Sequence, residues 1–298
     1  MRLIAILLAA IAGSLAHASS GAAYLIEAGK AKASAAKRVT KRPGNTLGTV
    51  PIIMYHRFGE KEENMIRSRK NFKNDLARLY KLGFRPVTLE EFASDRMNLP
   101  PGASPVVMTF DDSHPDQFRY LADGSIDPNC AVGMWQSFAK KHPDFPIKAT
   151  FFILPNGPFG QKGKAQKKID TLLSWGCEIG SHAWSHKPLT RLEDHEVKNE
   201  LAASIEYCRK FGVEPRSFAP PYGIYPKNLS LVKEFEFKGH QYKFNYAVLA
   251  GSEPNIPPDH SGFNRFRMFR IQAYEGFSGI TFWLNRYEHG KKAAYVEP

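Results

Sequence analysis

The sequence predicts an α/β fold: a closed or nearly closed (β/α) barrel of about seven to eight strands. From residue 49 onward, short apolar runs alternate with amphipathic helical stretches, a pattern typical of a parallel sheet. The chain has no glycine-rich nucleotide fingerprint, and one domain with so many successive strand-helix units favours a barrel over an open sheet. Polar residues follow two of the expected strands, at the end where such barrels carry out their chemistry.

The expected elements follow one another along the chain. Apolar runs predict strands at residues 51–55, 85–87, 106–110, 148–154, 177–180, around 217, 246–250 and 266–274. Helical spacing predicts helices at residues 72–82, 132–141, 165–175, 192–211, 228–235 and near 282. Thr88-Leu-Glu-Glu91 has the form of a capping box and opens a further helix. Residues 113–133 form a loop longer than the usual strand-helix connection, which either shapes a substrate cleft or is a surface insertion.

The N-terminus has the order of a secretory signal peptide, here residues 1–18. Met1-Arg2 precedes an apolar run to residue 16 and the small-residue triplet Ala16-His17-Ala18. The run is short for a membrane span of about 20 residues, although an uncleaved anchor is the alternative. Residues 19–48 are expected to be a flexible basic linker, and residues 49–298 the catalytic domain. We therefore expect an exported protein, periplasmic or secreted and in contact with the envelope, with no integral membrane segment after signal cleavage.

Charge and cysteine content exclude several classes of protein. The formal net charge is +12, but no nucleic-acid recognition motif accompanies it, so we expect a solvated basic surface and no nucleic-acid partner. The three cysteines, Cys130, Cys177 and Cys208, leave at least one without a partner and include no CxxC pair. They indicate neither a disulfide framework nor a cysteine metal site. The sequence does not fix the oligomeric state.

Two aspartates and two histidines form a candidate metal site. Asp111 and Asp112 end one expected strand, while His182 and His186 follow another. Two imidazoles and a carboxylate commonly hold a divalent cation, leaving positions for water and substrate. The second carboxylate could accept a proton, provided that the strand ends and turns there, because adjacent strand side chains point to opposite faces. Taken singly, the histidines could be ordinary surface or core residues, and the aspartates could simply begin a turn.

Three motifs in order give these residues a family context. Thr109-Phe-Asp-Asp112, His182-Ala-Trp-Ser-His186 and Phe218-Ala-Pro-Pro-Tyr-Gly223 resemble the first three motifs of the polysaccharide deacetylase family, the NodB homology domain or carbohydrate esterase family 4. The likeness runs from about residue 49 to 274. It implies a distorted (β/α) barrel and a metal-dependent hydrolase that removes N-acetyl groups from an extracellular or cell-envelope polysaccharide. The expected partner is therefore an acetylated glycan.

The resemblance also implies a role for each motif residue. Asp111 would be the general base, and Asp112, His182 and His186 would bind a divalent metal, usually zinc or a similar ion. The backbone N–H of Tyr222 would hold the oxyanion that forms during the reaction.

The chain departs from the family pattern at three places. Ala183 stands where a serine or threonine usually fixes the loop, and Ala219 where many members carry an arginine that orients the catalytic aspartate. Arg270 could supply that guanidinium from a neighbouring strand. The usual Leu-x-His motif of the general acid is absent; His289 is a C-terminal alternative with a surface-like context, and His56 could reach the barrel mouth.

Other functions stay open at this point. An O-acetyl polysaccharide esterase would use the same chemistry, for example on acetylated xylan. The altered arginine position and the missing acid also fit a degenerate, non-catalytic carbohydrate-binding member. A metal-dependent hydrolase of non-sugar amides is a third option.

Overall fold

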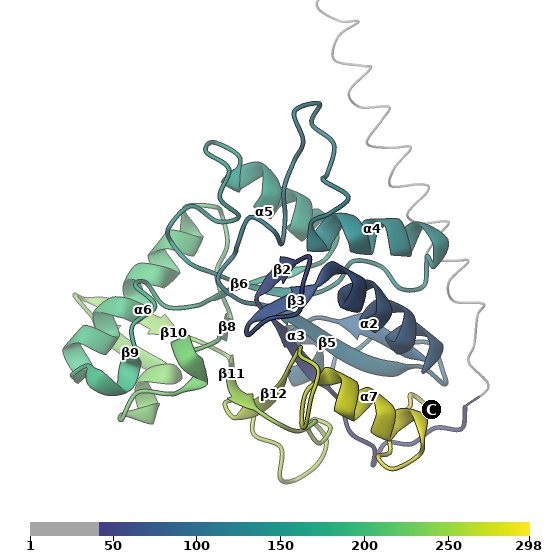
Figure 1. Ribbon diagram of the computed structural model, residues 1–298. Coiled ribbons are helices and arrows are strands. Elements are labelled where there is room, and N and C mark those ends of the chain that lie inside the picture. Colours follow the sequence, from purple (N-terminus) through teal and green to yellow (C-terminus); the bar gives the residue numbers. More distant parts are fainter. Residues whose placement is uncertain (1–41) are drawn as a thin grey trace, which may run out of the picture.

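A computed structural model describes residues 42–298, in which an eight-stranded sheet closes into a barrel (Figure 1). The strand order is β1-β12-β11-β8-β7-β6-β5-β4, and pairing of β1 with β5 closes the ring while β4 lies beside β5. All pairings within this sheet are parallel. The predicted barrel is therefore confirmed. The expected signal peptide, residues 1–18, and residues 19–41 of the expected linker lie outside the described residues.

The elements agree with most of the expected ranges. The barrel strands are β1 (Ile52–Tyr55), β4 (Phe84–Val87), β5 (Ser104–Phe110), β6 (Thr150–Ile153), β7 (Glu178–Ser181), β8 (Ser217–Phe218), β11 (Tyr246–Gly251) and β12 (Met268–Gln272). The α-helices are α2 (Arg69–Lys81), α3 (Leu89–Ala93), α4 (Ala131–Lys141), α5 (Ala165–Ser174), α6 (Asp194–Arg209) and α7 (Ile280–Glu288). Short 3-10 helices are η1 (Leu189–Arg191), η2 (Pro221–Gly223) and η3 (Leu229–Val232). The capping box of Thr88 and Glu91 opens α3 as expected.

The longer helices lie around the outside of the barrel, and α6 packs on the side where β8 and β11 meet (Figure 1). Strand β5 shows how the two faces of the sheet differ. Val106, Met108 and Phe110 belong to the layer between the sheet and helices α2, α4 and α5. Val107 belongs to a second cluster, with side chains from β1, β6, β11 and β12, inside the barrel. Because strand side chains alternate, Asp111 continues the inward-facing set.

The expected helix at residues 228–235 is wrong. Only η3 is helical there, and β9 (Glu234–Phe237) pairs with β10 (His240–Lys243) in an antiparallel hairpin. The sequence Glu-Phe-Glu-Phe alternates with the period of a strand. Lys238 and Gly239 both have positive φ, as in the two-residue turns that match strand twist. A second two-stranded pair, β2 (Arg57–Gly59) with β3 (Ile66–Ser68), was not expected from the sequence.

Residues 42–48, expected to belong to the linker, contact the barrel. Arg42 donates to the carbonyls of Gly83 and Gly102 and to the Ser104 hydroxyl, and Asn45 pairs with Val296.

Cys130, Cys177 and Cys208 are all buried free thiols, in keeping with the expected lack of a disulfide framework. Among the described helices, none combines the length and the apolar character that crossing a membrane requires.

Candidate active site

The candidate residues meet at one rim of the barrel because all its strands are parallel. Asp111 and Asp112 follow β5, His182 follows β7, and Tyr222 lies in η2 just after β8. His56 directly follows β1, the strand that pairs with β5. Carboxyl ends of parallel strands face the same side, so residues far apart in sequence converge there.

Arg270 and Asp111 form a buried ion pair inside the barrel. The Arg270 Nη1 to Asp111 Oδ1 distance is 2.6 Å, and both side chains are 1% exposed. Arg270 lies two residues after Met268, which belongs to the inner cluster, so its side chain faces inward as well. Burial alone would raise the pKa of Asp111, but Arg270, His182 and His56 outweigh it and lower the pKa below its usual value. Asp111 is therefore an ionised carboxylate although its side chain is buried.

Asp112, His182 and His186 have the arrangement of metal ligands. One donor atom from each lies within 4.8 Å of the others; Asp112 Oδ1 is 3.3 Å from His182 Nε2 and 3.4 Å from His186 Nε2. Asp112 Oδ1 and His182 Nε2 are buried and have no hydrogen-bond partner within residues 42–298. Buried polar atoms without partners are rare. Two of them turned toward one point fit a cation that this donor set would hold.

The tautomer of His182 also suits a metal ligand. Its Nδ1 lies 2.7 Å from the carbonyl oxygen of Ala219, which can only accept, so Nδ1 carries the hydrogen. When the ring is neutral, its lone pair is therefore on Nε2, the nitrogen that lies 3.3 Å from Asp112 Oδ1. A second ring nitrogen fixed by a carbonyl is the usual support of a metal-bound histidine.

The charges around this set favour a cation. Burial raises the pKa of Asp112, but His114 and His182 outweigh it, and the pKa falls well below the usual range. Burial lowers the pKa of His182, yet Asp111 and Asp112 outweigh it and leave the pKa raised. Two carboxylates thus draw a positive charge to this point, either a proton on His182 or a metal ion in its place.

The backbone around the site is unusual. Five non-glycine residues at the rim have φ between 49° and 69°: Asp112, Ser113, Ala183, His186 and Tyr222. Left-handed φ is uncommon in non-glycine residues and gathers at functional sites. At Asp112 it supplies the turn that splits the two aspartates, since the strand ends at Phe110.

A buried glutamate holds the loop between the two histidines. Glu200 of α6, 6% exposed, accepts hydrogen bonds from the Trp184 and Ser185 N–H groups and from the Ser185 hydroxyl. These bonds secure the segment in which Ala183 lacks the expected hydroxyl. Sequence reasoning missed Glu200, because its place on the inner face of α6 becomes evident only when the helix packs beside the loop.

Two further histidines lie near the aspartates, whereas His289, the C-terminal alternative for the general acid, lies away from them. His56 Nε2 is 3.7 Å from Asp111 Oδ2, and His114 Nε2, which sequence reasoning missed, is 3.5 Å from Asp112 Oδ2. His114 lines a hollow of about 420 Å³ together with Asp112 and His186. His289 instead bonds the Asn285 carbonyl at the end of its own helix, on the exposed surface.

Comparison with known proteins identifies part of this arrangement. Residues 98–240 match the profile of the polysaccharide deacetylase family. This segment belongs to the polysaccharide deacetylase family. It contains Asp111, Asp112, His182, His186 and Tyr222, whereas His56 and Arg270 lie outside it.

Relatives of the polysaccharide deacetylase segment are similar over short stretches. The peptidoglycan-N-acetylglucosamine deacetylase PgdA of Listeria monocytogenes is 29% identical over 85 residues, which cover 28% of this chain and 17% of that protein. Chitin deacetylase 1 of Cryptococcus neoformans is 33% identical over 78 residues, covering 26% of this chain and 16% of that protein. The chain thus spans about a sixth of the length of these relatives.

Solved structures resemble the barrel over most of its length. The deacetylase PplD of Streptococcus pyogenes has a TM-score of 0.58 and 19% identity, covering 85% of this chain and 100% of that one. A polysaccharide deacetylase from Bacillus cereus has a TM-score of 0.60 and 18% identity, covering 81% and 69%. At these identities the likeness concerns the fold.

Proposed function

We propose that this chain is an exported, metal-dependent hydrolase that removes N-acetyl groups from a cell-envelope or extracellular polysaccharide. The observation that carries the proposal is the pairing of a buried Asp111–Arg270 ion pair with the converging Asp112, His182 and His186. The family match, and the peptidoglycan and chitin named for the relatives, support an acetylated glycan as substrate.

The metal, for which we propose zinc, would be held by Asp112, His182 and His186. Bound there, a divalent cation supplies Lewis acidity beside the acetyl carbonyl. The histidine and carboxylate donors are ligands that zinc commonly uses.

Asp111 would serve as the general base. Its lowered pKa keeps it ionised, and Arg270 holds its Oδ1, which leaves Oδ2 toward the rim where water would attack. Asp111 accepts the proton of that water as the new carbon–oxygen bond forms. The Tyr222 backbone N–H would donate to the oxyanion, and the Tyr222 ring lies 5.0 Å from the His186 ring, between centroids.

Breaking the carbon–nitrogen bond requires a proton for the leaving amine. We propose His56 as its donor, because its Nε2 lies 3.7 Å from Asp111 Oδ2 and can take up the proton that Asp111 removes from the water. Burial lowers the pKa of His56 below its usual value, so once protonated it gives that proton up readily to the amine. It would stand in for the missing histidine motif near the C-terminus.

The experiment is acetate release from chitin oligomers, peptidoglycan, poly-N-acetylglucosamine and acetylated xylan, with metal content determined on the same sample. We expect acetate from at least one of the N-acetylated glycans, and its loss after chelation. Release from acetylated xylan alone would assign an O-acetyl esterase instead. Glycan binding without acetate from any substrate or metal would assign a non-catalytic carbohydrate-binding protein.

A further inference from the structure

The backbone pairing between β1 and β5 stops just before the two residues proposed to move protons. The register ends with Tyr55 opposite Phe110, and the Asp111 N–H still donates to the Tyr55 carbonyl, at 2.9 Å. His56 then lies between β1 and β2, outside both strands. The next carbonyl along each strand, that of His56 and that of Asp111, is therefore beyond the paired part of the sheet.

The side chain of Gln117 joins these two carbonyls. Gln117 is 0% exposed, and its Nε2 lies 2.6 Å from the His56 carbonyl oxygen and 2.5 Å from the Asp111 carbonyl oxygen. Carbonyl oxygens only accept and the amide nitrogen carries two hydrogens, so each carbonyl receives one hydrogen bond. These two bonds, the Gln117 clamp, continue the link between β1 and β5 past the end of their pairing.

Gln117 is itself held in place by its backbone. Its N–H donates to the His114 carbonyl, and its carbonyl accepts from the N–H of Val132 in the first turn of α4, both at 3.0 Å. The sequence left open whether the loop at residues 113–133 shapes a cleft or is a surface insertion. Through Gln117, the first part of this loop instead supports the ends of two strands at the site.

His56 depends on the Gln117 clamp more than Asp111 does. Asp111 is also held by its N–H bond to Tyr55 and by the Arg270 guanidinium at 2.6 Å. The His56 side chain, in contrast, makes no hydrogen bond within residues 42–298, and its Nε2 is 3.7 Å from Asp111 Oδ2. Loss of the clamp would therefore free His56 while Asp111 stays in place.

We propose that Gln117 is a positioning residue, which holds His56 where it can take a proton from Asp111 and pass it to the leaving amine. This inference rests on the proposed function and on the role given there to His56. Because Gln117 is buried, it acts through His56 and does not reach the substrate. A misplacement of about 1 Å can cost about 10²-fold in rate, so loss of the Gln117 clamp should slow the protonation of the amine.

A double-variant cycle with Gln117→Met and His56→Asn tests this role. Methionine has nearly the length of glutamine and no donor. We expect Gln117→Met to lower kcat for acetate release from the active glycan about 10- to 100-fold, with KM and metal content unchanged. The double variant should have the kcat of His56→Asn alone, because residues that act as one unit are not additive. Additive losses, or an unchanged kcat in Gln117→Met, would overturn the proposal.

Hydrolysis of para-nitrophenyl acetate shows whether the loss concerns the general acid. Nitrophenolate leaves without a proton, so this substrate needs the metal and Asp111 but no proton donor. Gln117→Met should therefore hydrolyse it at close to the wild-type rate. A loss as large as that with the glycan would show a general disturbance of the site and would refute the positioning of His56.

A second variant keeps the test valid if Gln117→Met does not fold, which circular dichroism reveals. Gln117→Glu keeps the shape of the side chain and, in its protonated form, donates one hydrogen bond rather than two. Its loss of kcat should be smaller than that of Gln117→Met and should again be absent in the His56→Asn background. A loss of kcat that persists there would count against the proposal.

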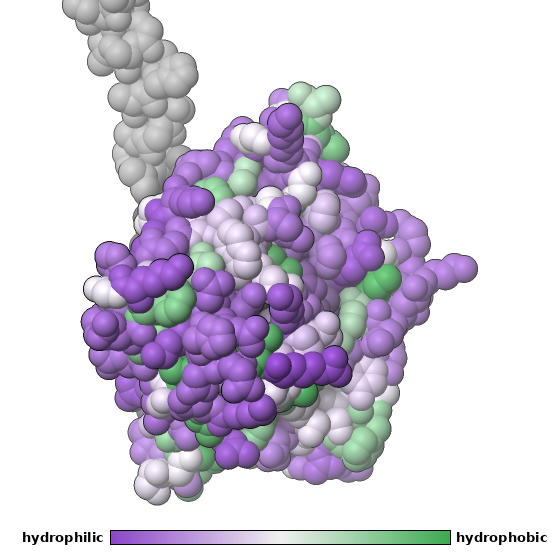
Figure 2. All heavy atoms as spheres, turned by 90° about the vertical axis from the view of Figure 1, so that its left-hand side faces the viewer, coloured by the Kyte–Doolittle hydropathy of each residue, from purple (hydrophilic) through white to green (hydrophobic). Residues whose placement is uncertain are grey.

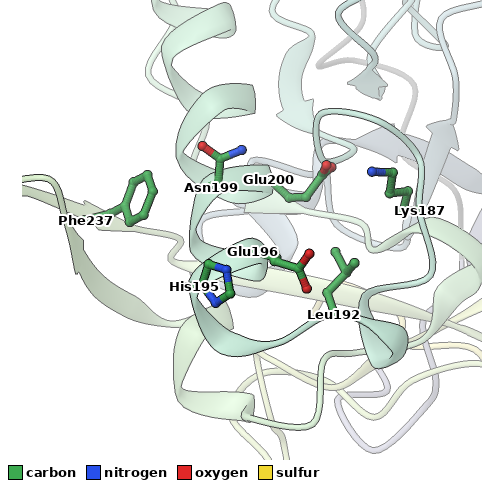
Figure 3. Close-up of a pocket in the computed structure, with 7 residues that line it drawn as sticks. All are labelled: Lys187, Leu192, His195, Glu196, Asn199, Glu200 and Phe237. Carbon is green, nitrogen blue, oxygen red and sulfur yellow. The ribbon is translucent and has the colours of Figure 1, made fainter.

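Asn199→Met is the matched control, because it removes an exposed amide far along the chain from either strand end. Asn199 of α6 faces Phe237 of β9 across a hollow of about 260 Å³ (Figure 3). The surrounding surface, with α6 and the β9–β10 hairpin, is mostly hydrophilic (Figure 2). This variant should leave kcat unchanged with both substrates.

The NMR signals of the His56 ring separate this proposal from the proposed function. They are assigned by their absence in His56→Asn. In Gln117→Met we expect them to shift or broaden, while those of His182, whose Nδ1 bonds the Ala219 carbonyl, stay unchanged. This result without acetate release by the wild type would refute the deacetylase and retain the clamp. Unchanged His56 signals with normal release by the wild type would retain the deacetylase and refute the clamp.

Discussion

At the residue scale, Asp111 depends on Arg270 for its charge. A buried carboxylate without a partner would be protonated or strongly destabilising, and the guanidinium at 2.6 Å prevents this. The family position for that arginine holds Ala219, so a different strand, β12, supplies the same group.

Replacing Arg270 by methionine tests that dependence. Without Arg270, burial dominates and the pKa of Asp111 rises, so the acid limb of the pH–activity profile should move to higher pH and kcat/KM should fall at least tenfold. Activity against pH provides the measurement. The control is Arg267→Met, at an exposed arginine of the preceding segment. An unchanged acid limb in Arg270→Met would contradict the assigned pairing.

His56 and His114 differ in what they face. If His56 donates the proton to the amine, His56→Asn should lower kcat about 10²–10⁴-fold, the usual contribution of general acid–base catalysis. His114 faces Asp112 Oδ2 rather than Asp111, so His114→Asn should lower kcat much less. Steady-state kinetics of both variants, with metal content measured, decide the matter. Equal kcat losses in the two would remove His56 from the proposed role.

At the element scale, the loop after β7 is positioned by α6. Glu200 replaces, from another element, the hydroxyl that Ala183 lacks, and it takes three hydrogen bonds from the segment between the two histidines. A buried acceptor of this kind fixes the relative position of His182 and His186. Mutating a residue that supports metal ligands in this way commonly lowers metal affinity by about 10- to 100-fold.

We therefore expect Glu200→Gln to weaken metal binding about tenfold. The amide can accept through its oxygen but cannot receive all three donors equally well. Metal titration by calorimetry, with the fold checked by circular dichroism, measures the effect. Glu253→Gln, at an exposed glutamate, should bind metal as the wild type does. A folded Glu200→Gln protein with unchanged metal affinity would contradict the positioning role.

Elements with strong periodicity were predictable from sequence, and those set by local turns were not. The β5 run and the α3 capping box follow from apolar patterning and side-chain chemistry near in sequence. The β9–β10 hairpin was not predictable in this way, because its alternation of polar and apolar residues spans only four residues and Lys238–Gly239 is a weak sequence signal for a turn. Likewise, the aspartate and histidine set was readable from motifs, whereas Glu200 and His114 join the site only through folding.

At the scale of the whole molecule, an aromatic cluster outside the barrel supports the strand that ends at Asp111. Phe72 of α2 packs edge-on against Tyr55, Phe58 and Phe110, with ring centroids 5.2, 4.8 and 6.4 Å away. Phe110 immediately precedes the aspartate pair. Packing of the outer layer therefore sets the strand end at the site.

Removing this ring should lower stability without altering the chemistry of the folded protein. Phe72→Ala is expected to lower the free energy of unfolding by about 3–5 kcal/mol, because the fully buried ring leaves a cavity. Urea denaturation measures it. Phe277→Ala, at a 79% exposed ring, should change stability by less than about 0.5 kcal/mol. A Phe72→Ala protein as stable as the wild type would show that this contact contributes little.

The central claim is that Asp111 performs proton transfer beside a metal held by Asp112, His182 and His186. The most direct measurement is acetate release from the active glycan together with metal content, for wild type, Asp111→Asn and His182→Ala. We predict that Asp111→Asn retains metal and loses at least 10³-fold of the activity, while His182→Ala loses both. Acetate release that survives in Asp111→Asn, or full metal content in His182→Ala, would contradict the account.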